Sequence, residues 1–186
     1  MAMSRQHSID CDGLILDLRA NGGGQVSSSE LLARHFIDKR RHVGYMSHKT
    51  GPGHNDFSRQ IPIYLDPLTR GTIWLKPVFV LVNQGVYSAA NDFVLRLKGL
   101  PHVRIIGVKT GGGAGLPMSE LPNGWGIRFS ASRTYDTAGK DVEFGIEPDI
   151  KVEGELKRTD EKDLFIDASA RLLTVWIKAI KKHLKK

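Results

Sequence analysis

The chain has 186 residues, of which 40% are hydrophobic and 25% are charged, a composition typical of a soluble globular protein with one core. No apolar run approaches the roughly 18 to 20 residues that cross a bilayer, so we expect no integral membrane segment. The net charge of +7 depends largely on the terminal KAIKKHLKK, whose five lysines indicate a solvated helix end rather than a nucleic-acid surface.

The N-terminal region carries few structural signals. A single cysteine, Cys11, excludes an internal disulfide and leaves the redox compartment open. The sequence MAMSRQHSIDC lacks the apolar core of a signal peptide. We therefore expect residues 1–11 to be a disordered or truncated remnant, and residues 12–186 to form one domain.

The first half of the chain predicts a strand, a turn and a helix. Residues 13–18 (GLILDL) are an apolar run that ends at a glycine-rich turn, and residues 26–37 continue with apolar residues at helical spacing. Residues 40–48 (RRHVGYMSH) predict a second strand. Residues 49–60 (KTGPGHNDFSRQ) are polar and rich in glycine, which is typical of an exposed loop.

The same unit of strand, turn and helix then recurs. Residues 77–83 (PVFVLVN) predict the clearest buried strand, and a helix is expected from Ser88 to about Lys98. Residues 103–108 (VRIIGV) predict a further buried strand. The following KTGGGAGLP contains too much glycine for a helix or strand, so we expect a loop there.

The C-terminal part predicts a hairpin and a long helix. Residues 124–144 alternate around a TAGK turn, which suggests a β-hairpin, and Pro148 makes the next turn rigid. Apolar residues from Leu164 to Leu184 recur every three to five positions, as in an amphipathic helix. Strands that alternate with helices predict a largely parallel α/β sheet, whose ligands lie at the carboxyl ends of the strands. The turns at Gly22 and Gly85 both lie at such ends.

Ser88 follows one of these ends and has two interpretations. It could be an ordinary helix N-cap, worth about 1 kcal/mol. It could instead be a nucleophile, because a hydroxyl at a helix start projects past the strand, and the N–H of Ala89 can face an anion. The Gly-x-Ser-x-Gly signature of the nucleophile elbow is absent. Position alone leaves both interpretations open.

A glycine run offers a second hydrogen-bond donor. In DLRANGGGQ, the Gly22–Gly24 loop lets the backbone approach a ligand closely, so an N–H of Gly23 or Gly24 could complete an oxyanion hole with Ala89. Taken alone, the run indicates only a tight loop. A phosphate-binding loop is disfavoured because the Lys-Ser/Thr ending is absent.

Four segments in this order, LILDLRANGGG, VNQGVYSAANDFV, IIGVKTGGGAG and EFGIEPDI, resemble the C-terminal processing (tail-specific) serine peptidase family, which includes the tricorn protease core. The resemblance covers about residues 12 to 152. It implies a ClpP/crotonase-like ββα spiral core with the long helix appended. It also implies that Ser88 is the nucleophile and that Ala89 with Gly23 or Gly24 donates to the oxyanion.

The residue at the position of the general base differs from that in the processing enzymes of this family. In those enzymes the general base is a lysine within the segment that matches TGGGAG. Here Gly113 or a neighbouring glycine occupies that position, and Lys109 lies at a different position of the motif. The chain therefore resembles the tricorn-like branch, which uses Ser, His, Ser and Glu. That resemblance implies Glu143 as the carboxylate that orients the base, with Glu147 as the second candidate. A hairpin-edge glutamate is the alternative for Glu143.

The histidine of that branch has no convincing counterpart. His7 next to Ser8 matches superficially, but a fraying terminus holds a base poorly. His48 and His54 lie in or near the polar loop. We therefore hypothesise that this chain is a catalytic core from which the segment with the base has been removed, and we expect it to hydrolyse peptides slowly.

Two functions follow from the sequence. The first is a serine endopeptidase acting on peptides or proteins, with Gly112, Gly113 and Trp125 in substrate binding, although core packing would equally explain Trp125. The second is a non-catalytic module that binds a peptide or an apolar ligand on the same fold. The seven histidines show no metal-ligand spacing, so we predict no metal and no cofactor. The resemblance implies a periplasmic or cell-surface location for the full-length protein.

Overall fold

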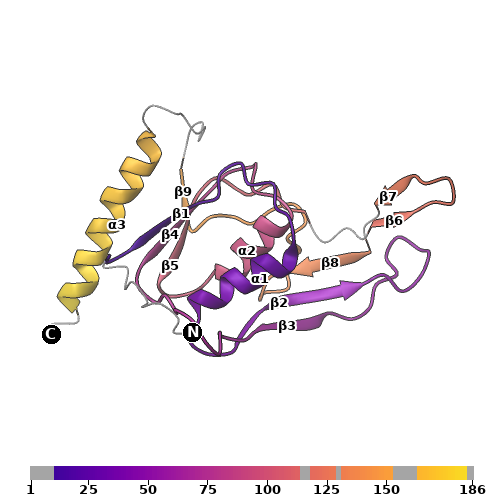
Figure 1. Cartoon of the computed structure of the whole chain (residues 1–186), viewed down its shortest axis with the longest axis horizontal. Coiled ribbons are helices and arrows are strands. Elements are labelled where there is room, and N and C mark those ends of the chain that lie inside the picture. Colours follow the sequence, from indigo (N-terminus) through magenta and orange to yellow (C-terminus); the bar gives the residue numbers. More distant parts are fainter. Residues whose placement is uncertain (1–10, 114–117, 129–130, 153–162, 184–186) are drawn as a thin grey trace, which may run out of the picture.

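The computed structural model describes residues 11–113, 118–128, 131–152 and 163–183. A parallel sheet lies at its centre and confirms the three predicted buried strands, each within a residue or two (Figure 1). A short fourth strand, too brief to leave a pattern in the sequence, completes this sheet. The strand order is β1 (Leu14–Asp17), β4 (Val78–Val82), β5 (Val103–Gly107) and β9 (Ile150–Lys151).

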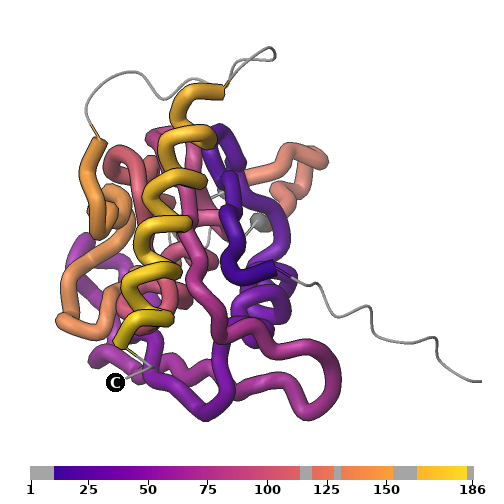
Figure 2. The backbone as a smooth tube through the Cα atoms, turned by 90° about the vertical axis from the view of Figure 1, so that its left-hand side faces the viewer, coloured from indigo at the N-terminus to yellow at the C-terminus, as the bar shows by residue number. Residues whose placement is uncertain are grey.

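Helices cover both faces of the parallel sheet. On one face lie α1 (Val26–Ala33), which continues into a 3-10 turn at Arg34–Phe36, and α2 (Ala89–Leu97). The long helix α3 (Leu164–His183) crosses the other face, as Figure 2 shows. All three helices were expected from the sequence, and none in the described residues is long and apolar enough to cross a membrane.

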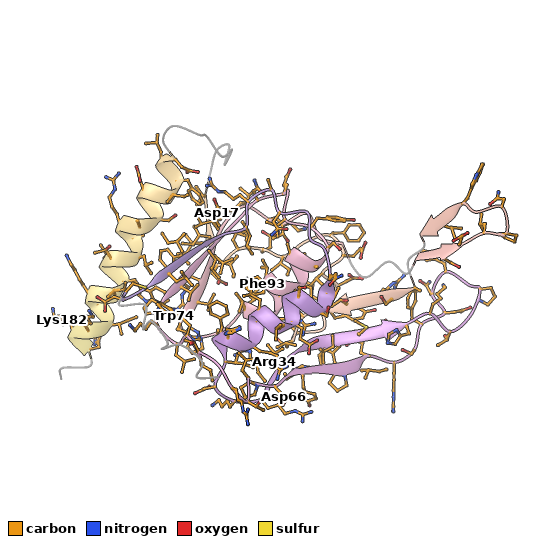
Figure 3. The ribbon with its side chains drawn as sticks, in the orientation of Figure 1. Asp17, Arg34, Asp66, Trp74, Phe93 and Lys182 are labelled. Carbon is orange, nitrogen blue, oxygen red and sulfur yellow. The ribbon has the colours of Figure 1, made fainter. Side chains whose placement is uncertain are left out.

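The two-sided burial explains the unbroken apolar run of β4. Val80 and its alternate neighbours pack toward α2, with Phe93 of α2 in the same cluster (Figure 3). Phe79 and Leu81 point the other way, and the Phe79 ring stacks on Trp176 of α3 with centroids 5.4 Å apart. Side chains that alternate between two buried faces must all be apolar, which distinguishes this strand from a half-exposed one.

A second, antiparallel sheet extends from the core in the order β3 (Ile61–Leu65), β2 (Arg41–His48) and β8 (Ser132–Tyr135). The predicted strand over residues 40–48 is confirmed as β2. β3 was not predicted, because Pro62 interrupts the strand pattern in the sequence. Proline is tolerated there because β3 is an edge strand.

The predicted hairpin over residues 124–144 is confirmed around its turn and needs a correction only for its first residues. The N–H of Asp136 donates to Lys140 O at 2.9 Å, and the N–H of Val142 donates to Thr134 O at 3.0 Å. Tyr135 and Asp141 also form an antiparallel bridge, so the end of β8 pairs across the TAGK turn. β7 (Gly126–Arg128) pairs with β6 (Met118–Glu120), in a separate hairpin that projects from the body in Figure 1, while β8 pairs with β2. Alternation shows which residues share a face of a strand, but it does not identify the partner strand.

Candidate active site

Two loops at the carboxyl ends of β1 and β4 are joined by hydrogen bonds. The side-chain oxygen of Asn83 accepts from the N–H of Ala20 at 2.9 Å and from that of Gly85 at 3.0 Å. The N–H of Tyr87 donates to Asn21 O at 3.1 Å. The glycine-rich loop and the loop before Ser88 therefore form one unit, next to Asp17 at the end of β1 (Figure 3). This role of Asn83 was not predicted, although the position of Asn83 directly after a buried strand is a signal for it.

Ser88 adopts a backbone conformation that residues with a side chain rarely occupy. Its φ is 55° and its ψ is −125°, and it precedes α2 without any side-chain capping hydrogen bond. The N-cap interpretation thus lacks the hydrogen bond that would justify it. Such a conformation costs on the order of 1–3 kcal/mol and persists where surrounding structure enforces it. Here the N–H of Ser88 is held by Gly112 O at 2.8 Å.

Replacing Ser88 with glycine is expected to stabilise the fold. Glycine reaches this conformation without strain, and after its larger loss of chain entropy the gain should be about 1 kcal/mol. The free energy of unfolding in urea measures it. Ser28→Gly, inside α1, is the matched control and should lower stability by roughly 0.5 kcal/mol. Equal destabilisation by both substitutions would show that Ser88 is not strained.

Two backbone N–H groups near Ser88 are available to an anion. Those of Ala89 and Gly24 donate no backbone hydrogen bond within the described residues. Gly23 differs, because its N–H donates to the side-chain oxygen of Asn21 at 3.0 Å. Gly23 packs so tightly that a Cβ added there would lie 2.7 Å from Ala89 N. The geometry thus favours Gly24 over Gly23 as the second donor and gives Gly23 a packing role.

Two cavities adjoin at Ser88 and Ala89. One, of about 180 Å³, lies between α1 and α2 and includes Gly24, Ala89 and Phe93 in its lining. The other, of about 60 Å³, is lined by Ser88 together with Gly113 and residues of β2 and β8. Ser88 is half-buried and lines the second of these cavities. These features are those required for a nucleophile beside a side-chain pocket.

The predicted Gly112, Gly113 and Glu143 lie together next to Ser88. Gly112 accepts the N–H of Ser88, as noted above, and the N–H of Gly113 donates to the backbone oxygen of Glu143 at 2.8 Å. A Cβ at Gly112 would lie 2.0 Å from Glu143 O, so only glycine fits there. The structure therefore brings the glycine loop and the glutamate segment to the nucleophile candidate.

A buried polar network fixes the segment around Glu143. Thr110 donates from Oγ1 to the side-chain oxygen of Asn91 at 2.7 Å and accepts the N–H of Ile146 at 2.7 Å. Asn91 in turn donates to Val142 O at 3.3 Å. Satisfied buried networks of this kind rigidify their surroundings. Asn91 and Thr110 were not predicted, because neither stands in a sequence pattern of its own.

The two glutamate candidates differ in setting. Glu143 is half-buried, and its own N–H is held by Asp141 at 2.8 Å. Glu147 is exposed and lies 3.9 Å from Lys109, which is itself 43% exposed. Lys109 and Glu147 therefore form a solvated pair at the rim. Glu143 remains the better candidate for a carboxylate that orients a base.

Neither the predicted histidines nor Trp125 is brought to the site. No histidine or lysine of the described chain lines the two cavities. His48 and His54 are exposed, and His7 lies outside the described residues. Trp125 is 71% exposed at the turn of the projecting hairpin, and neither of these cavities includes it. A role for Trp125 in substrate binding stays a prediction, and no group of three metal-ligating side chains occurs in the described residues.

Arg19 ties the glycine-rich loop to α3. Its side chain is fully buried, with Nη2 2.8 Å from Asp17 and a second ion pair to Asp163. Asp163 also accepts the N–H groups of Phe165 and Ile166, both at 3.1 Å, and so caps α3. Arg19, four residues before Gly23, is thus held by a helix from the other end of the chain.

The Asp163→Asn substitution is expected to destabilise the protein by roughly 1 to 3 kcal/mol at neutral pH, because asparagine keeps the cap but loses the charged hydrogen bonds to Arg19. Hydrogen bonding from Arg19 lowers the pKa of Asp163. The difference in the free energy of unfolding between wild type and variant should therefore have its full value above about pH 4 and disappear as the pH falls through the lowered pKa. Urea unfolding at several pH values measures it, and Asp167→Asn is the control. A difference that stays constant as the pH falls, down to the pH at which both proteins unfold, would contradict the ion-pair account.

Comparisons with known proteins agree with the resemblance seen in the sequence. The chain matches peptidase family S41 over residues 2–152. It is 30% identical over 150 residues to the chloroplastic C-terminal processing peptidase of Tetradesmus obliquus, covering 80% of this chain and 30% of that protein. It is 29% identical over 143 residues to the carboxy-terminal processing protease CtpA of Bacillus subtilis, covering 76% of this chain and 28% of that protein. The chain thus spans less than a third of the length of these relatives.

Solved structures share the fold. A Parabacteroides merdae protein superposes with a TM-score of 0.77 at 46% identity, covering 88% of this chain and 52% of that one. The photosystem II D1 C-terminal processing protease gives 0.59 at 27% identity, covering 82% of this chain and 38% of that one. The tricorn protease, at 20% identity, has a TM-score of 0.52 and covers 91% of this chain and 15% of that one, which bears on the fold alone. The ClpP/crotonase-like core with a long C-terminal helix is thereby confirmed.

Proposed function

The chain belongs to peptidase family S41, and from this premise we propose that it carries the acylation site of a serine endopeptidase, with Ser88 as the nucleophile. The observation that supports the proposal most is the strained backbone of Ser88 beside the free N–H of Ala89. A helix cap needs neither feature. Peptide and protein substrates follow from the family, and the substrate of the whole protein is part of the proposal.

The chemistry proceeds in two steps. Ser88 Oγ attacks the carbonyl carbon of the scissile peptide bond while a base removes its proton. The oxyanion that forms accepts hydrogen bonds from the N–H groups of Ala89 and Gly24. The C–N bond then breaks, the leaving amine takes the proton from the base, and an ester remains on Ser88. Water hydrolyses this ester in the second step.

We further propose that the base lies outside the described residues. Support comes from the linings of the two cavities, which in the described chain contain no histidine or lysine. Glu143, fixed beside the glycine loop, would orient that base and stabilise its protonated form. The resemblance still predicts a location outside the cytoplasm for the full-length protein.

The absence of histidine and lysine from the two cavity linings of the described chain also favours a second function, a peptide-binding module that has lost catalysis. A fluorophosphonate separates the two, because it reports a nucleophilic serine without requiring peptide turnover. Its phosphorus forms a bond to the serine oxygen and fluoride leaves. Mass spectrometry of the treated native protein should locate the adduct on Ser88. Peptide binding without any adduct would support the module instead.

A further inference from the structure

A large cavity lies at the opposite end of the parallel sheet from Ser88. Its volume is about 500 Å³, within the range of small-molecule sites. Pro77 and His102, which directly precede β4 and β5, contribute to it, whereas Ser88 follows the carboxyl end of β4. Five residues of strand span about 15 Å, so the two sites are separate. The apolar wall consists of Phe36, Ile37, Leu75, Pro77, Leu100 and Ile180.

Arg41 supplies this cavity with an unpaired positive charge. Its guanidinium donates from Nη2 to Lys98 O at 3.2 Å, whereas its buried Nε has no hydrogen-bond partner in the described chain. No carboxylate of the described residues forms an ion pair with Arg41, and burial lowers its pKa. A partly buried cation without a counter-ion is costly, and an anionic ligand would offset that cost.

Two further cations in the lining reinforce this charge, whereas His102 does not, because burial lowers its pKa and favours the neutral ring. His102 also lines the cavity, with a buried Nε2 that has no partner among the described residues. Lys39 and Arg40 lie in the lining too, and Arg40 turns outward to Asp66, 3.8 Å away. Asp38 is the one acidic residue in the lining of the described chain, and it is exposed. The cavity thus combines a cationic side with an apolar wall.

We propose that this cavity binds an apolar monocarboxylate, with the carboxylate on Arg41 and the hydrocarbon against Leu75, Leu100 and Ile180. A guanidinium pairs with a carboxylate through charged hydrogen bonds. Arg41 lines the cavity and makes one hydrogen bond within the described residues, from Nη2 to Lys98 O, which leaves other N–H groups of its guanidinium for a carboxylate. The ligand is a small organic acid of the fatty-acid type. The site is independent of the proposed peptidase chemistry and shares no lining residue with the two cavities beside Ser88.

Octanoate, with octanol as the uncharged probe of equal length, tests the proposal. In a two-dimensional NMR titration of the full chain, octanoate should shift the amide signals of Leu100 and Ile180 and leave those around Ser88 unchanged. Octanol should bind at least about tenfold more weakly. Arg41→Gln should weaken octanoate binding by about tenfold or more, while Arg59→Gln, on the exposed polar loop, should bind as wild type does.

A second variant keeps the test decisive if Arg41→Gln does not fold. Leu75 is 46% exposed, so Leu75→Glu should fold and place a repelling charge in the cavity wall, abolishing octanoate binding. The proposal is overturned if wild type does not bind octanoate, if the shifts centre on Ser88, or if either variant binds octanoate as tightly as wild type.

Discussion

Ser88→Ala is expected to abolish covalent labelling by a fluorophosphonate. The reaction needs an oxygen nucleophile in line with the phosphorus, and alanine supplies none. Loss should be complete, because no other serine of the described chain combines a strained backbone with the free N–H of the next residue. Adduct formation is measured by intact-protein mass spectrometry. The variant should remain folded, since Ser88 makes no side-chain capping hydrogen bond whose loss would cost stability.

Ser28→Ala is the matched control for this labelling experiment. Ser28 lines the cavity that Ala89 also lines, but it is an exposed residue inside a regular helix. Labelling of Ser28→Ala should equal that of wild type. If no residue of this chain serves as the base, hydroxide must remove the proton from Ser88, and the labelling rate of wild type should rise with pH. An adduct that persists in Ser88→Ala but disappears in Ser28→Ala would assign the nucleophile to Ser28 of α1 instead.

The sequence was sufficient where structure is determined by neighbouring residues. The apolar runs of β1, β4 and β5 match the structure because strands buried on both faces can contain little else. The glycine loops could be located because tight backbone approaches require glycine, and a Cβ at Gly112 would indeed strike Glu143 O. Ser88 was singled out by its position after a buried strand, whereas its role as nucleophile and that of Glu143 as the orienting carboxylate came from the family resemblance and stay predictions.

Long-range partners could not be obtained in this way. Arg19 and Asp163 are 144 positions apart, and neither stands in a motif that names the other. The pairing of β7 with β6 could not be predicted, because alternation is the same for any antiparallel neighbour. In the sequence, Arg41 is one of two arginines at the start of a predicted strand. Only the packed structure shows that its Nε is buried without a partner in the described chain. These contacts depend on which segments, distant in the sequence, pack together in the fold.

The site also concentrates backbone strain in two adjoining loops. Ala20 and Ser88 are the described residues other than glycine with positive φ, at 61° and 55°. Both loops are held by the side-chain oxygen of Asn83, through the N–H groups of Ala20 and Gly85. Strain of this kind persists when surrounding contacts over-determine it. We infer that the closed unit of two loops, more than either glycine run, keeps the N–H of Ala89 directed into the cleft.

Gly23→Ala is expected to reduce the labelling rate by about 100-fold or more, the effect of losing an oxyanion donor. A Cβ at Gly23 would lie 2.6 Å from Tyr87 O and 2.7 Å from Ala89 N, both backbone atoms that cannot move without displacing Ser88. Its φ of +96° adds a further cost of roughly 1 to 2 kcal/mol for any residue with a Cβ.

Gly22→Ala is the control one residue away, because an added Cβ there meets nothing within 4 Å. Its labelling rate should stay within about twofold of wild type, as is usual for an exposed position outside special geometry. Thermal unfolding of both variants separates a displaced loop from an unfolded protein. If Gly23→Ala labels as fast as Gly22→Ala while both are folded, the tight contact between the two loops does not align the nucleophile, and the oxyanion geometry proposed for Ala89 and Gly24 fails with it.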